Sequence, residues 1–551
     1  MVRKPGLPWF GAMTQPSEPV AACDIRFDRA VNLDDPTDWS GGRKKWTPAA
    51  LAAIAIYFAL CLIGIMSFQN AIWDIETQAI TLTIGALGLW RYGWWFTHAA
   101  RALVYGRFVY PRMRRRGKEV WDAGWRPRHM HFMMTTYKEH REITEMVVRS
   151  IVSEIRNSGV PGTIWLGSSD RFDEDIIVNF LEREAGDLDL TLRIIRQNVS
   201  GKRAAIGLVL RAMSRLPVED DDLVIFMDGD FILAEGAVAR CMPLFKLYPD
   251  LQACTTDEEV ICIGPRWIET WLKMRFAQRR LAMQSHALSG RVLTLTGRMS
   301  VFRARNLLQL EFIRLLEADH LDNWLWGNFR FLSGDDKSTW YYMLKNGARM
   351  CYVPDALGYT VEVIEGSGLD RMVQNFRRWS GNMLRNGSRA LKLGPRRMPF
   401  FIWWCLLDQR LSMWTMLVSP VLAVSAMVLQ GFDYILAYVF FIAISRMLLS
   451  LVLFTYSRRI HMAYPWILYF NQLINASVKV YCIFRLSKQR WSNRGNQTAG
   501  AGGSELVERA RNAMASWCTA VAIALLFLAT LHYTRMIEAP SAFIISSALG
   551  L

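Results

Sequence analysis

The stretch Leu223–Asp230, which reads LVIFMDGD, decides the fold of this chain. Its apolar run, bounded by acidic residues, predicts a buried strand. Asp228 and Asp230 come directly after that run, so both carboxylates lie at the carboxyl edge of a sheet, where open α/β sheets bind ligands. Paired carboxylates suit Mg²⁺ or Mn²⁺, and such a metal usually also takes substrate phosphates. A solvated acidic turn is the other interpretation, and the choice between the two depends on the neighbouring segments.

Strand and helix patterns alternate around this stretch, which predicts an α/β fold with a mostly parallel sheet. A second strand ends in Gly167–Asp170, so several strand ends carry polar groups that can converge on a nucleotide. No Gly-x-Gly-x-x-Gly fingerprint and no Walker loop is present, which disfavours hydride transfer and nucleotide hydrolysis. The further expected strands and helices lie at 129–136, 143–155, 163–166, 190–195 and 204–215.

Three polar segments outside the opening stretch are candidates for the same site. Lys202 precedes a predicted helix, where an ammonium group suits a phosphate, although a solvated basic turn fits equally well. Ser333–Lys337, which reads SGDDK, opens another helix; a cap explains one aspartate, and a general base would explain a second. The segment 371–389 combines arginines with aromatic residues, which suits a diphosphate and a sugar ring, or else a surface of anionic lipid.

Composition indicates a membrane protein that carries a water-facing domain. The chain has 551 residues, of which 52% are hydrophobic and 21% charged. Five segments approach the ~20 apolar residues that a bilayer core requires. These expected spans lie at about 48–68, 78–99, 412–431, 434–455 and 514–535.

Lysine and arginine set the expected orientation of these spans. Basic residues precede the first span and follow the second, whereas the loop 69–77 has none, so the loop lies outside and the block 105–395 is cytosolic. The polar, proline-containing start of the chain predicts a flexible cytosolic tail without a signal peptide. Much of the formal net charge of +16 is then positive-inside bias, and it does not indicate nucleic-acid binding. The nine scattered cysteines predict buried thiols in a reducing compartment.

Polar residues within the apolar regions need their own explanation. Arg91, Asp408 and Arg410 are costly at membrane depth and usually face a partner or a wet cavity. The segment 463–486 carries a polar stripe, which predicts an amphipathic helix in the membrane interface, with a sixth span as the alternative. The spans are rich in tryptophan, which fits either interface belts or a passage lined for sugars.

Taken in order, these pieces resemble the processive, membrane-embedded family 2 glycosyltransferases that make cellulose, hyaluronan and related polymers. The chain is most similar to the glycosyltransferase subunit of bacterial alginate synthases. The similarity covers roughly residues 78–535, and its most specific part is RFAQRRLAMQSHALSGRVLTLTGRMSVFRA from Arg275. Further similar segments are IGALGLWRY from Ile84, SGDDKSTW from Ser333, YVPDA from Tyr352, NGSRALKLG from Asn386 and DQRLSMWT from Asp408.

The resemblance implies a role for each motif on the donor side. Asp170 would touch the nucleotide base, and Lys202 and Asp228 would support the nucleotide. Asp230, with Asp228, would hold Mg²⁺ or Mn²⁺ on the diphosphate, and Arg378 would contact the same diphosphate. The cofactor implied is therefore a divalent metal, and the donor is a nucleotide sugar.

On the acceptor side, the resemblance implies that Asp336, beside Asp335, is the general base, and that Trp379 lies at the acceptor sugar. Thr296, Gly297 and Arg298 would lie near the acceptor end. A gating loop would cover the donor site. Its implied residues are Arg485, Lys488, Arg490 and Trp491, within 485–494.

Two motifs depart from the cellulose-type pattern. The Gln-x-x-Arg-Trp motif reads Asn375–Trp379, with Gln374 one place early, which weakens a role for that glutamine but not for Arg378 or Trp379. The base motif is Gly-Asp-Asp, as in hyaluronan-type enzymes, and this argues mildly against a cellulose product.

The resemblance also implies an organisation and a product. The organisation is a cytosolic tail at 1–45, two spans within 46–100, a GT-A domain at 105–395, an interfacial segment and two spans at 396–456, an interfacial helix and gating-like loop at 457–510, and a last span and tail at 511–551. The chain would polymerise GDP-mannuronate into poly-β-1,4-mannuronate and export it across a bacterial inner membrane. UDP-glucose-dependent β-glucan synthesis is the alternative, and a non-catalytic membrane scaffold is a weaker one.

Basic residues and the absence of a cyclic-di-GMP motif indicate which product and which protein partners to expect. An anionic product would suit basic lining residues, for which Arg298, Lys337 and Arg377 are the candidates. The chain has no Arg-x-x-x-Arg module of the kind that binds cyclic-di-GMP. A cyclic-di-GMP-binding co-polymerase subunit and periplasmic export proteins are therefore the expected protein partners, besides membrane lipid and the growing polysaccharide.

Overall fold

The structure, a computed structural model, describes residues 45–68, 78–197, 201–364, 366–491, 497–534 and 537. These residues belong to one compact unit of the chain, 36–551. Most of the expected N-terminal tail and the expected outer loop 69–77 lie outside the described residues.

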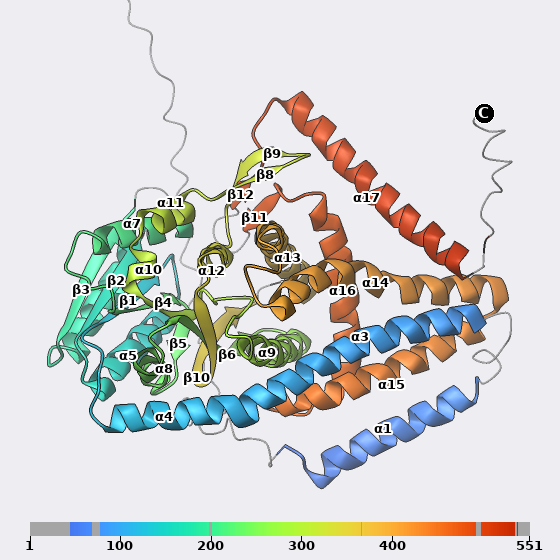
Figure 1. Cartoon of the computed structure of the whole chain (residues 1–551), viewed down its shortest axis with the longest axis horizontal. Coiled ribbons are helices and arrows are strands. Elements are labelled where there is room, and N and C mark those ends of the chain that lie inside the picture. The colour runs from blue at the N-terminus through green and yellow to red at the C-terminus, as the bar shows by residue number, and fades with distance from the viewer. Residues whose placement is uncertain are drawn as a thin grey trace, which may run out of the picture. The chain divides into compact units, whose positions relative to one another are not determined.

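An eight-stranded sheet forms the centre of the α/β domain, in the order β3-β2-β1-β4-β7-β6-β10-β5. Strands β7 and β5 pair antiparallel with their neighbours, and the other pairs are parallel, so the predicted α/β fold with a mostly parallel sheet is confirmed (Figure 1). The strands are β1 (Met130–Thr135), β2 (Gly162–Ser168), β3 (Leu190–Arg196), β4 (Leu223–Asp228), β5 (Phe231–Leu233), β6 (Leu251–Ile263), β7 (Met299–Arg303) and β10 (Arg349–Val363).

The opening stretch of the sequence is the buried centre of this sheet. In β4, residues 223–227 are buried, and the strand lies between β1 and β7. A central strand that is covered on both faces of the sheet can be apolar at every position. This explains why residues 223–227 do not alternate between apolar and polar side chains. The strand ends at Asp228, so the Asp-x-Asp motif stands at the carboxyl edge, as predicted.

Helices from the α/β connections cover the sheet and bury apolar stripes against it. In α5, for example, Val147, Val148 and Ile151 are fully buried, and glycine follows the helix in the left-handed conformation that stops it. These helices are α5 (Arg141–Ser158), α6 (Arg171–Glu184), α7 (Lys202–Met213), α8 (Ala237–Leu247), α9 (Arg266–Ala287), α10 (Ala304–Leu307), α11 (Leu310–Glu317), α12 (Asp335–Lys345) and α13 (Gly368–Lys392). Two small hairpins accompany them: β8 (His320–Asn323) with β9 (Gly327–Arg330), and β11 (Gln489–Trp491) with β12 (Gln497–Ala499).

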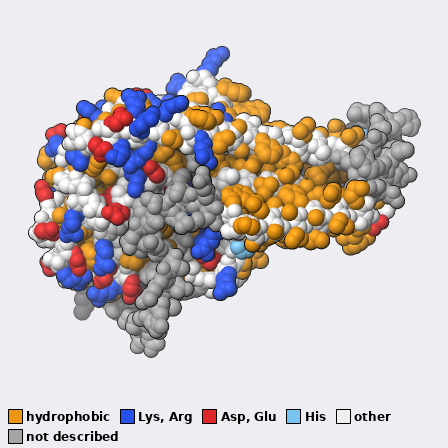
Figure 2. Space-filling model, turned by 90° about the horizontal axis from the view of Figure 1, so that it is seen from below, with side chains coloured by type: hydrophobic (Ala, Val, Ile, Leu, Met, Phe, Trp, Pro, Cys, Tyr) orange, Lys and Arg blue, Asp and Glu red, His pale blue; other side chains and the backbone are white. Residues whose placement is uncertain are grey.

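Four helices among the described residues are long and apolar enough to cross a membrane: α1 (Pro48–Met66), α14 (Phe400–Gln430), α15 (Asp433–Tyr456) and α17 (Glu505–Tyr533). They correspond to four of the expected spans. Large apolar side chains are exposed on them, including Leu60, Ile63, Val428 and Phe527, which would be unfavourable in water. Figure 2 shows apolar side chains gathered over the long helices, whereas charged side chains gather over the α/β domain.

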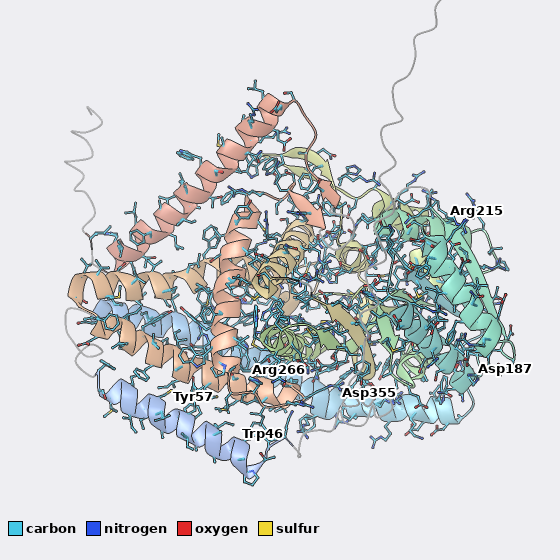
Figure 3. All side chains as sticks on the ribbon, turned by 180° about the vertical axis from the view of Figure 1, so that it is seen from behind. Trp46, Tyr57, Asp187, Arg215, Arg266 and Asp355 are labelled. Atoms are coloured by element: carbon cyan, nitrogen blue, oxygen red, sulfur yellow. The ribbon has the colours of Figure 1, made fainter. Side chains whose placement is uncertain are left out.

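The remaining expected span, 78–99, lies within α3 (Gln78–Val104), which is not among those four helices. Through a π-helical turn at Tyr105–Val109, α3 continues into α4 (Tyr110–Asp122). Arg114 on α4 forms an ion pair with Asp355 of β10 at 2.9 Å (Figure 3), so this continuous element connects the long helices to the sheet.

Helix α14 begins at Phe400, twelve residues before the expected span 412–431, and Asp408 and Arg410 lie within it. Asp408 is paired with Arg91 of α3, and Arg410 donates hydrogen bonds to the Leu384 carbonyl at 2.6 Å and to Ser388 Oγ at 2.7 Å. Because both charges have partners on neighbouring helices, the helix runs unbroken.

The ambiguous segment 463–486 forms α16 (Tyr464–Ile483), which is not among the four apolar helices and packs against α13, α14 and α15. Its polar stripe faces protein: Asn471 accepts a hydrogen bond from the Trp271 indole at 2.9 Å, and Asn475 accepts one from Ser380 at 3.2 Å. Whether α16 lies in the membrane interface or spans the membrane stays a prediction, but its polar side packs on α9 and α13 of the α/β domain.

Candidate active site

A cavity of about 1180 Å³ lies at the carboxyl edge of the sheet. The elements that contribute to it include the end of β4, the N-termini of α7 and α12, and parts of β6, β10, α9, α13 and α16. The sequence-predicted residues that line it are Lys202, Asp228, Asp230, Thr296, Gly297, Arg298, Asp335, Asp336, Lys337, Arg378 and Trp379. The fold therefore brings together most of the residues singled out from the sequence, although they span nearly 180 positions.

The turn after β4 is fixed by a close backbone approach. The Gly229 amide donates to the Thr135 carbonyl at 3.1 Å, and a Cβ at this glycine would lie 2.8 Å from the same oxygen. Asp228 donates its own amide to the Arg298 carbonyl at 3.2 Å. Glycine is thus required between the two aspartates, and the tight turn directs both carboxylates to the cavity.

Lys202 joins two carboxylates from different elements. Its Nζ lies 2.6 Å from Asp228 and 3.1 Å from Asp335. Burial opposes the charge on this ammonium group, but the two carboxylates raise the pKa of Lys202 above its ordinary value. The lysine is therefore permanently charged, and it holds the end of β4 against the start of α12.

The two aspartates at the start of α12 occupy opposite electrostatic environments. Burial alone would raise the pKa of Asp335, but the charges of Lys202 and Arg203 lower it below its usual value. For Asp336, burial and the neighbouring charge of Asp335 raise the pKa above its usual value. A stable anion beside a carboxylate of raised proton affinity is the arrangement expected of a positioning group and a general base.

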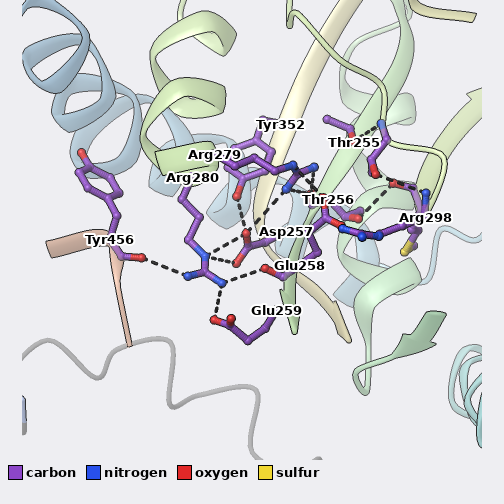
Figure 4. A network of polar contacts seen from close by, with 12 residues as sticks. Thr255, Thr256, Asp257, Glu258, Glu259, Arg279, Arg280, Arg298, Tyr352 and Tyr456 are labelled. Carbon is purple, nitrogen blue, oxygen red and sulfur yellow. Dashed lines mark hydrogen bonds and ion pairs between the residues drawn. The ribbon is translucent and has the colours of Figure 1, made fainter. Parts of the chain in front are cut away.

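A buried charge network holds the segment Thr296–Arg298 in place (Figure 4). Arg298 forms ion pairs with Glu258 at 2.7 Å and with Glu362 at 3.2 Å. Arg280 of α9 pairs with Asp257 of β6 at 2.9 Å, and it also donates to the Tyr456 carbonyl at the end of α15 at 3.2 Å. The network thus connects the central sheet to a long apolar helix.

Gly297 lies close to the start of α12. A Cβ there would lie 3.3 Å from Lys202 Nζ and 3.7 Å from the Asp336 Cβ. The Thr296–Arg298 segment therefore packs directly against Lys202 and the aspartates of α12.

Helix α13 supplies an aromatic surface at another part of the cavity. Trp379 stacks on Trp271 with ring centres 6.1 Å apart, and the Arg275 guanidinium lies 5.7 Å from the Trp379 ring centre. Arg378 also lines the cavity, and burial lowers its pKa. An indole face beside a guanidinium can hold a sugar ring and an anionic group together.

Several predicted site residues do not line this cavity. Asp170 caps α6, where its carboxylate accepts a hydrogen bond from the Phe172 amide at 3.0 Å. Arg485 donates to Thr519 on α17 at 2.8 Å, and Lys488 pairs with Glu508 on the same helix. Arg490 and Trp491 belong to β11, while residues 492–496 of the expected gating loop lie outside the described residues. The roles of these residues stay predictions.

The basic residues expected to pair with an anionic product have other surroundings. Arg298 is held by its two glutamates, and Lys337 donates to the Leu293 carbonyl at 2.7 Å. Arg377 is exposed and stacks over Tyr481, outside the lining of the cavity. Burial lowers the pKa of Lys337 to about 8.

Sequence reasoning missed Glu258, Glu362 and Arg275, and it noticed Lys479 only as part of a polar stripe. The signal for Glu258 was available, because Asp257–Glu259 interrupts an otherwise apolar strand. A second cavity of about 330 Å³ lies among α3, α14, α15 and α16. Four residues line both cavities and mark their junction: Gln278, Ala282, Asn475 and Lys479.

A mixed α/β sheet, an Asp-x-Asp turn at its carboxyl edge and a large polar cavity beside that turn fit a glycosyltransferase of the GT-A type. A family model described as "Glycosyltransferase like family 2" matches residues 127–382. Glycosyltransferase alg8 of Pseudomonas syringae pv. tomato is 38% identical over 80% of this chain and 90% of that protein. Glycosyltransferase alg8 of Azotobacter vinelandii is 35% identical over 80% of this chain and 89% of that protein.

The chain therefore belongs to the family 2 glycosyltransferases, and it is a hexosyltransferase of this family. Among solved structures, it is similar to the mannosyltransferase PcManGT from Pyrobaculum calidifontis, solved in complex with GDP-Man and Mn²⁺. That similarity has a TM-score of 0.45 at 18% identity and covers 73% of this chain and 98% of the mannosyltransferase.

Proposed function

We propose that this chain polymerises GDP-mannuronate into poly-β-1,4-mannuronate by inverting transfer and passes the polymer into its bundle of long helices. One observation carries the proposal: Asp336, the Asp-x-Asp turn and Trp379 line one cavity, and that cavity shares lining residues with a second one among the helices. The sequence resemblance to alginate-synthase glycosyltransferases supports the choice of donor, and relatives named glycosyltransferase alg8 support the same family.

Asp336 is the proposed general base. It removes the proton from the acceptor hydroxyl as the hydroxyl oxygen attacks the anomeric carbon, and the nucleoside diphosphate leaves from the opposite face. General-base catalysis of this kind contributes about 10²–10⁴-fold. The raised pKa of Asp336 supports this role, because a stronger base takes the proton more readily. Asp335 and Lys202 position the start of α12, and Arg378 is placed to contact the diphosphate.

The two carboxylates of the Asp-x-Asp turn fit a hard divalent cation such as Mg²⁺ or Mn²⁺. Asp228 already accepts a hydrogen bond from Lys202, so Asp230 is the principal proposed ligand. Within the described residues, no third His, Cys, Asp or Glu gathers with this pair at metal-binding distance. Diphosphate oxygens and water would therefore complete the shell, and the ion would neutralise charge on the leaving group.

Export is the second half of the proposal. A polymer that grows at Trp379 meets the junction residues Gln278, Asn475 and Lys479 before it reaches the helix bundle. We place the cavity on the cytosolic side of a bacterial inner membrane. A cyclic-di-GMP-binding co-polymerase and periplasmic export proteins are the partners that such a system would need, since no cyclic-di-GMP motif is found in the sequence.

Purified membranes that contain the full chain, given each labelled donor in turn with Mg²⁺ or Mn²⁺, test the donor and the metal together. GDP-mannuronate should give polymer that a mannuronate lyase degrades, and a chelator should abolish it until either metal is restored. Polymer from UDP-glucose and none from GDP-mannuronate would overturn the proposed donor. Donor turnover that a chelator leaves unchanged would overturn the metal.

A further inference from the structure

Two cations that line the catalytic cavity, Arg275 and Lys479, form no ion pair with a carboxylate among the described residues. Arg275 lies on α9, and its nearest polar contact is Gln278 Oε1 at 3.4 Å, while its Nε is buried without a hydrogen-bond partner among the described residues. Lys479 lies on α16 and forms no ion pair or hydrogen bond within the described part of the chain. Burial and the charge of Arg275 lower the pKa of Lys479 to about 8, and the charge of Asp408 opposes this shift. Both side chains line the catalytic cavity, and Lys479 also lines the second one.

Other cations of the cavity are neutralised by the protein itself. Lys202 has Asp228 and Asp335, Arg298 has Glu258 and Glu362, and Arg371 pairs with Glu362 at 2.9 Å. These ion pairs hold elements together and leave little charge for a ligand. Arg275 and Lys479 differ from them because neither has a structural carboxylate to hold.

A buried charge without a partner is costly, so a ligand that brings the opposite charge is stabilised there. Burial lowers the pKa of Arg275 to about 10, which leaves the guanidinium charged at neutral pH. The central carbon of the guanidinium lies 5.7 Å from the ring centres of both Phe376 and Trp379. The cation therefore stands beside the indole that is proposed to hold a sugar.

We propose that Arg275 and Lys479 form a carboxylate-binding subsite that holds a uronate of the growing polymer as it moves from the catalytic cavity into the helix bundle. The proposal rests on the proposed function and extends it, because it names the residues that recognise an anionic glycan. It replaces Arg298, Lys337 and Arg377 as the carboxylate-recognising set, since those residues have other partners or lie outside the cavity.

An oxyanion could also come from the donor diphosphate, but position favours the sugar carboxylate. The diphosphate belongs at Asp228 and Asp230, which line only the catalytic cavity. Lys479 lines both cavities, and Arg275 lies about one turn before Gln278, which also lines both. Lys479 therefore stands where the two cavities meet, and Arg275 stands next to that point beside Trp379.

Direct binding to the detergent-solubilised full chain tests this subsite without any need for donor turnover. The probes are a fluorescent β-1,4-linked oligomannuronate, its carboxyl-reduced counterpart, which is the same glycan without charge, and GDP. The variants are Arg275→Gln and Lys479→Gln. The control is Arg266→Gln, an exposed arginine at the start of the same helix, outside both cavities (Figure 3).

The wild-type chain should bind the acidic glycan more tightly than the neutral one. Each variant should weaken binding of the acidic glycan by roughly tenfold to a hundredfold, the usual effect of losing a charged hydrogen bond. Binding of the neutral glycan and of GDP should stay within about twofold, and Arg275→Lys should recover part of the loss.

Unchanged binding of the acidic glycan by both glutamine variants would overturn the subsite. Weaker GDP binding with unchanged glycan binding would assign the anion to the diphosphate and would also overturn it. An error in the proposed donor would give a different result. The wild-type chain would make no polymer from GDP-mannuronate in the donor assay, whereas the binding measurements do not depend on polymer synthesis.

Discussion

Lys202 on α7 donates a hydrogen bond to Asp228 at the end of β4, with 2.6 Å between Nζ and Oδ1. The same ammonium group lies 3.1 Å from Asp335, so a single side chain neutralises two aspartates that come from distant parts of the sequence. Both aspartates belong to the proposed reaction site. Removing the charge of Lys202 should therefore affect both the stability of the fold and the proposed reaction.

Replacing Lys202 with methionine should leave Asp228 and Asp335 facing each other without a counter-ion. Breaking such a buried ion pair typically costs roughly 3–5 kcal/mol, so the melting temperature should fall and polymer synthesis should be lost. Lys246→Met on α8 is the control, since that lysine is exposed and far from the site. Thermal unfolding of purified protein measures the first effect, and wild-type-like melting of the Lys202 variant would contradict the coupling.

Asp335→Asn and Asp336→Asn should separate stability from catalysis. The folded-state pKa of Asp335 lies below its ordinary value, so its charge stabilises the fold at neutral pH, and the asparagine variant should melt at a lower temperature. The folded-state pKa of Asp336 lies above its ordinary value, so its charge destabilises the fold. Asp336→Asn should therefore melt no lower than wild type while losing about 10²–10⁴-fold of the transfer rate. A well-folded Asp336→Asn chain that still makes polymer would refute its role as the base.

As the pH is lowered, the rate of transfer should begin to fall at a higher pH than it would if the base were an aspartate with an ordinary pKa. Asp336 must be ionised to accept a proton, and burial together with Asp335 raises its pKa, while Lys337 and Lys202 oppose the rise. Removing the neighbouring negative charge in Asp335→Asn should move this acid limb of the pH–rate profile to lower pH. The pH dependence of kcat at saturating donor measures this shift. If the acid limb has the same position in wild type and in Asp335→Asn, the limb reports the titration of a group other than Asp336.

Gly229→Ala should damage the site although the change adds one methyl group. The new Cβ would lie 2.8 Å from the Thr135 carbonyl, and backbone cannot move away as a side chain can. We expect a loss of roughly 1–3 kcal/mol in stability together with weaker donor binding, because the turn directs Asp228 and Asp230. Gly186→Ala is the control, since its nearest atom would be 3.9 Å away. Equal melting temperatures and donor affinities for the two variants would argue against a constrained turn.

Much of the fold followed from local pattern. The apolar run of β4 and the alternation of strands and helices depend on neighbouring residues, so the sequence could predict an α/β domain and the position of Asp228–Asp230. The antiparallel strand β7 between β4 and β6 was not foreseen, because its pairing depends on partners more than 40 positions away. The unbroken course of α14 likewise depends on Arg91, which is 317 residues from Asp408.

The candidate site, like the fold, was only partly predictable from the sequence. The motifs predicted which aspartates, arginines and tryptophans would meet, and most of them line one cavity. The sequence could not predict which cations were already neutralised. Arg298 looked available for a ligand, yet its partners Glu258 and Glu362 lie 40 and 64 positions away in the chain. Arg275 stood within a quoted motif without a role of its own, and its lack of a carboxylate partner among the described residues distinguishes it from Arg298.

The ion pair between Arg91 on α3 and Asp408 on α14 should be the main electrostatic connection between these helices. Its second hydrogen bond, from Nη2 to Oδ2, measures 3.3 Å, and the carboxylate is mostly buried. Either single change, Arg91→Gln or Asp408→Asn, leaves a charge unpaired in apolar surroundings. Each variant should therefore lower the melting temperature in detergent and reduce polymer output.

The double variant Arg91→Gln/Asp408→Asn removes both charges and should recover part of the loss, with a coupling energy of about 1–3 kcal/mol in a double-mutant cycle. Additive losses would mean that each residue acts through other partners. Both residues also line the second cavity, so the cycle should be measured for polymer output as well as for stability. If stability shows coupling and output does not recover, the pair serves the passage of the polymer in addition to holding the helices together.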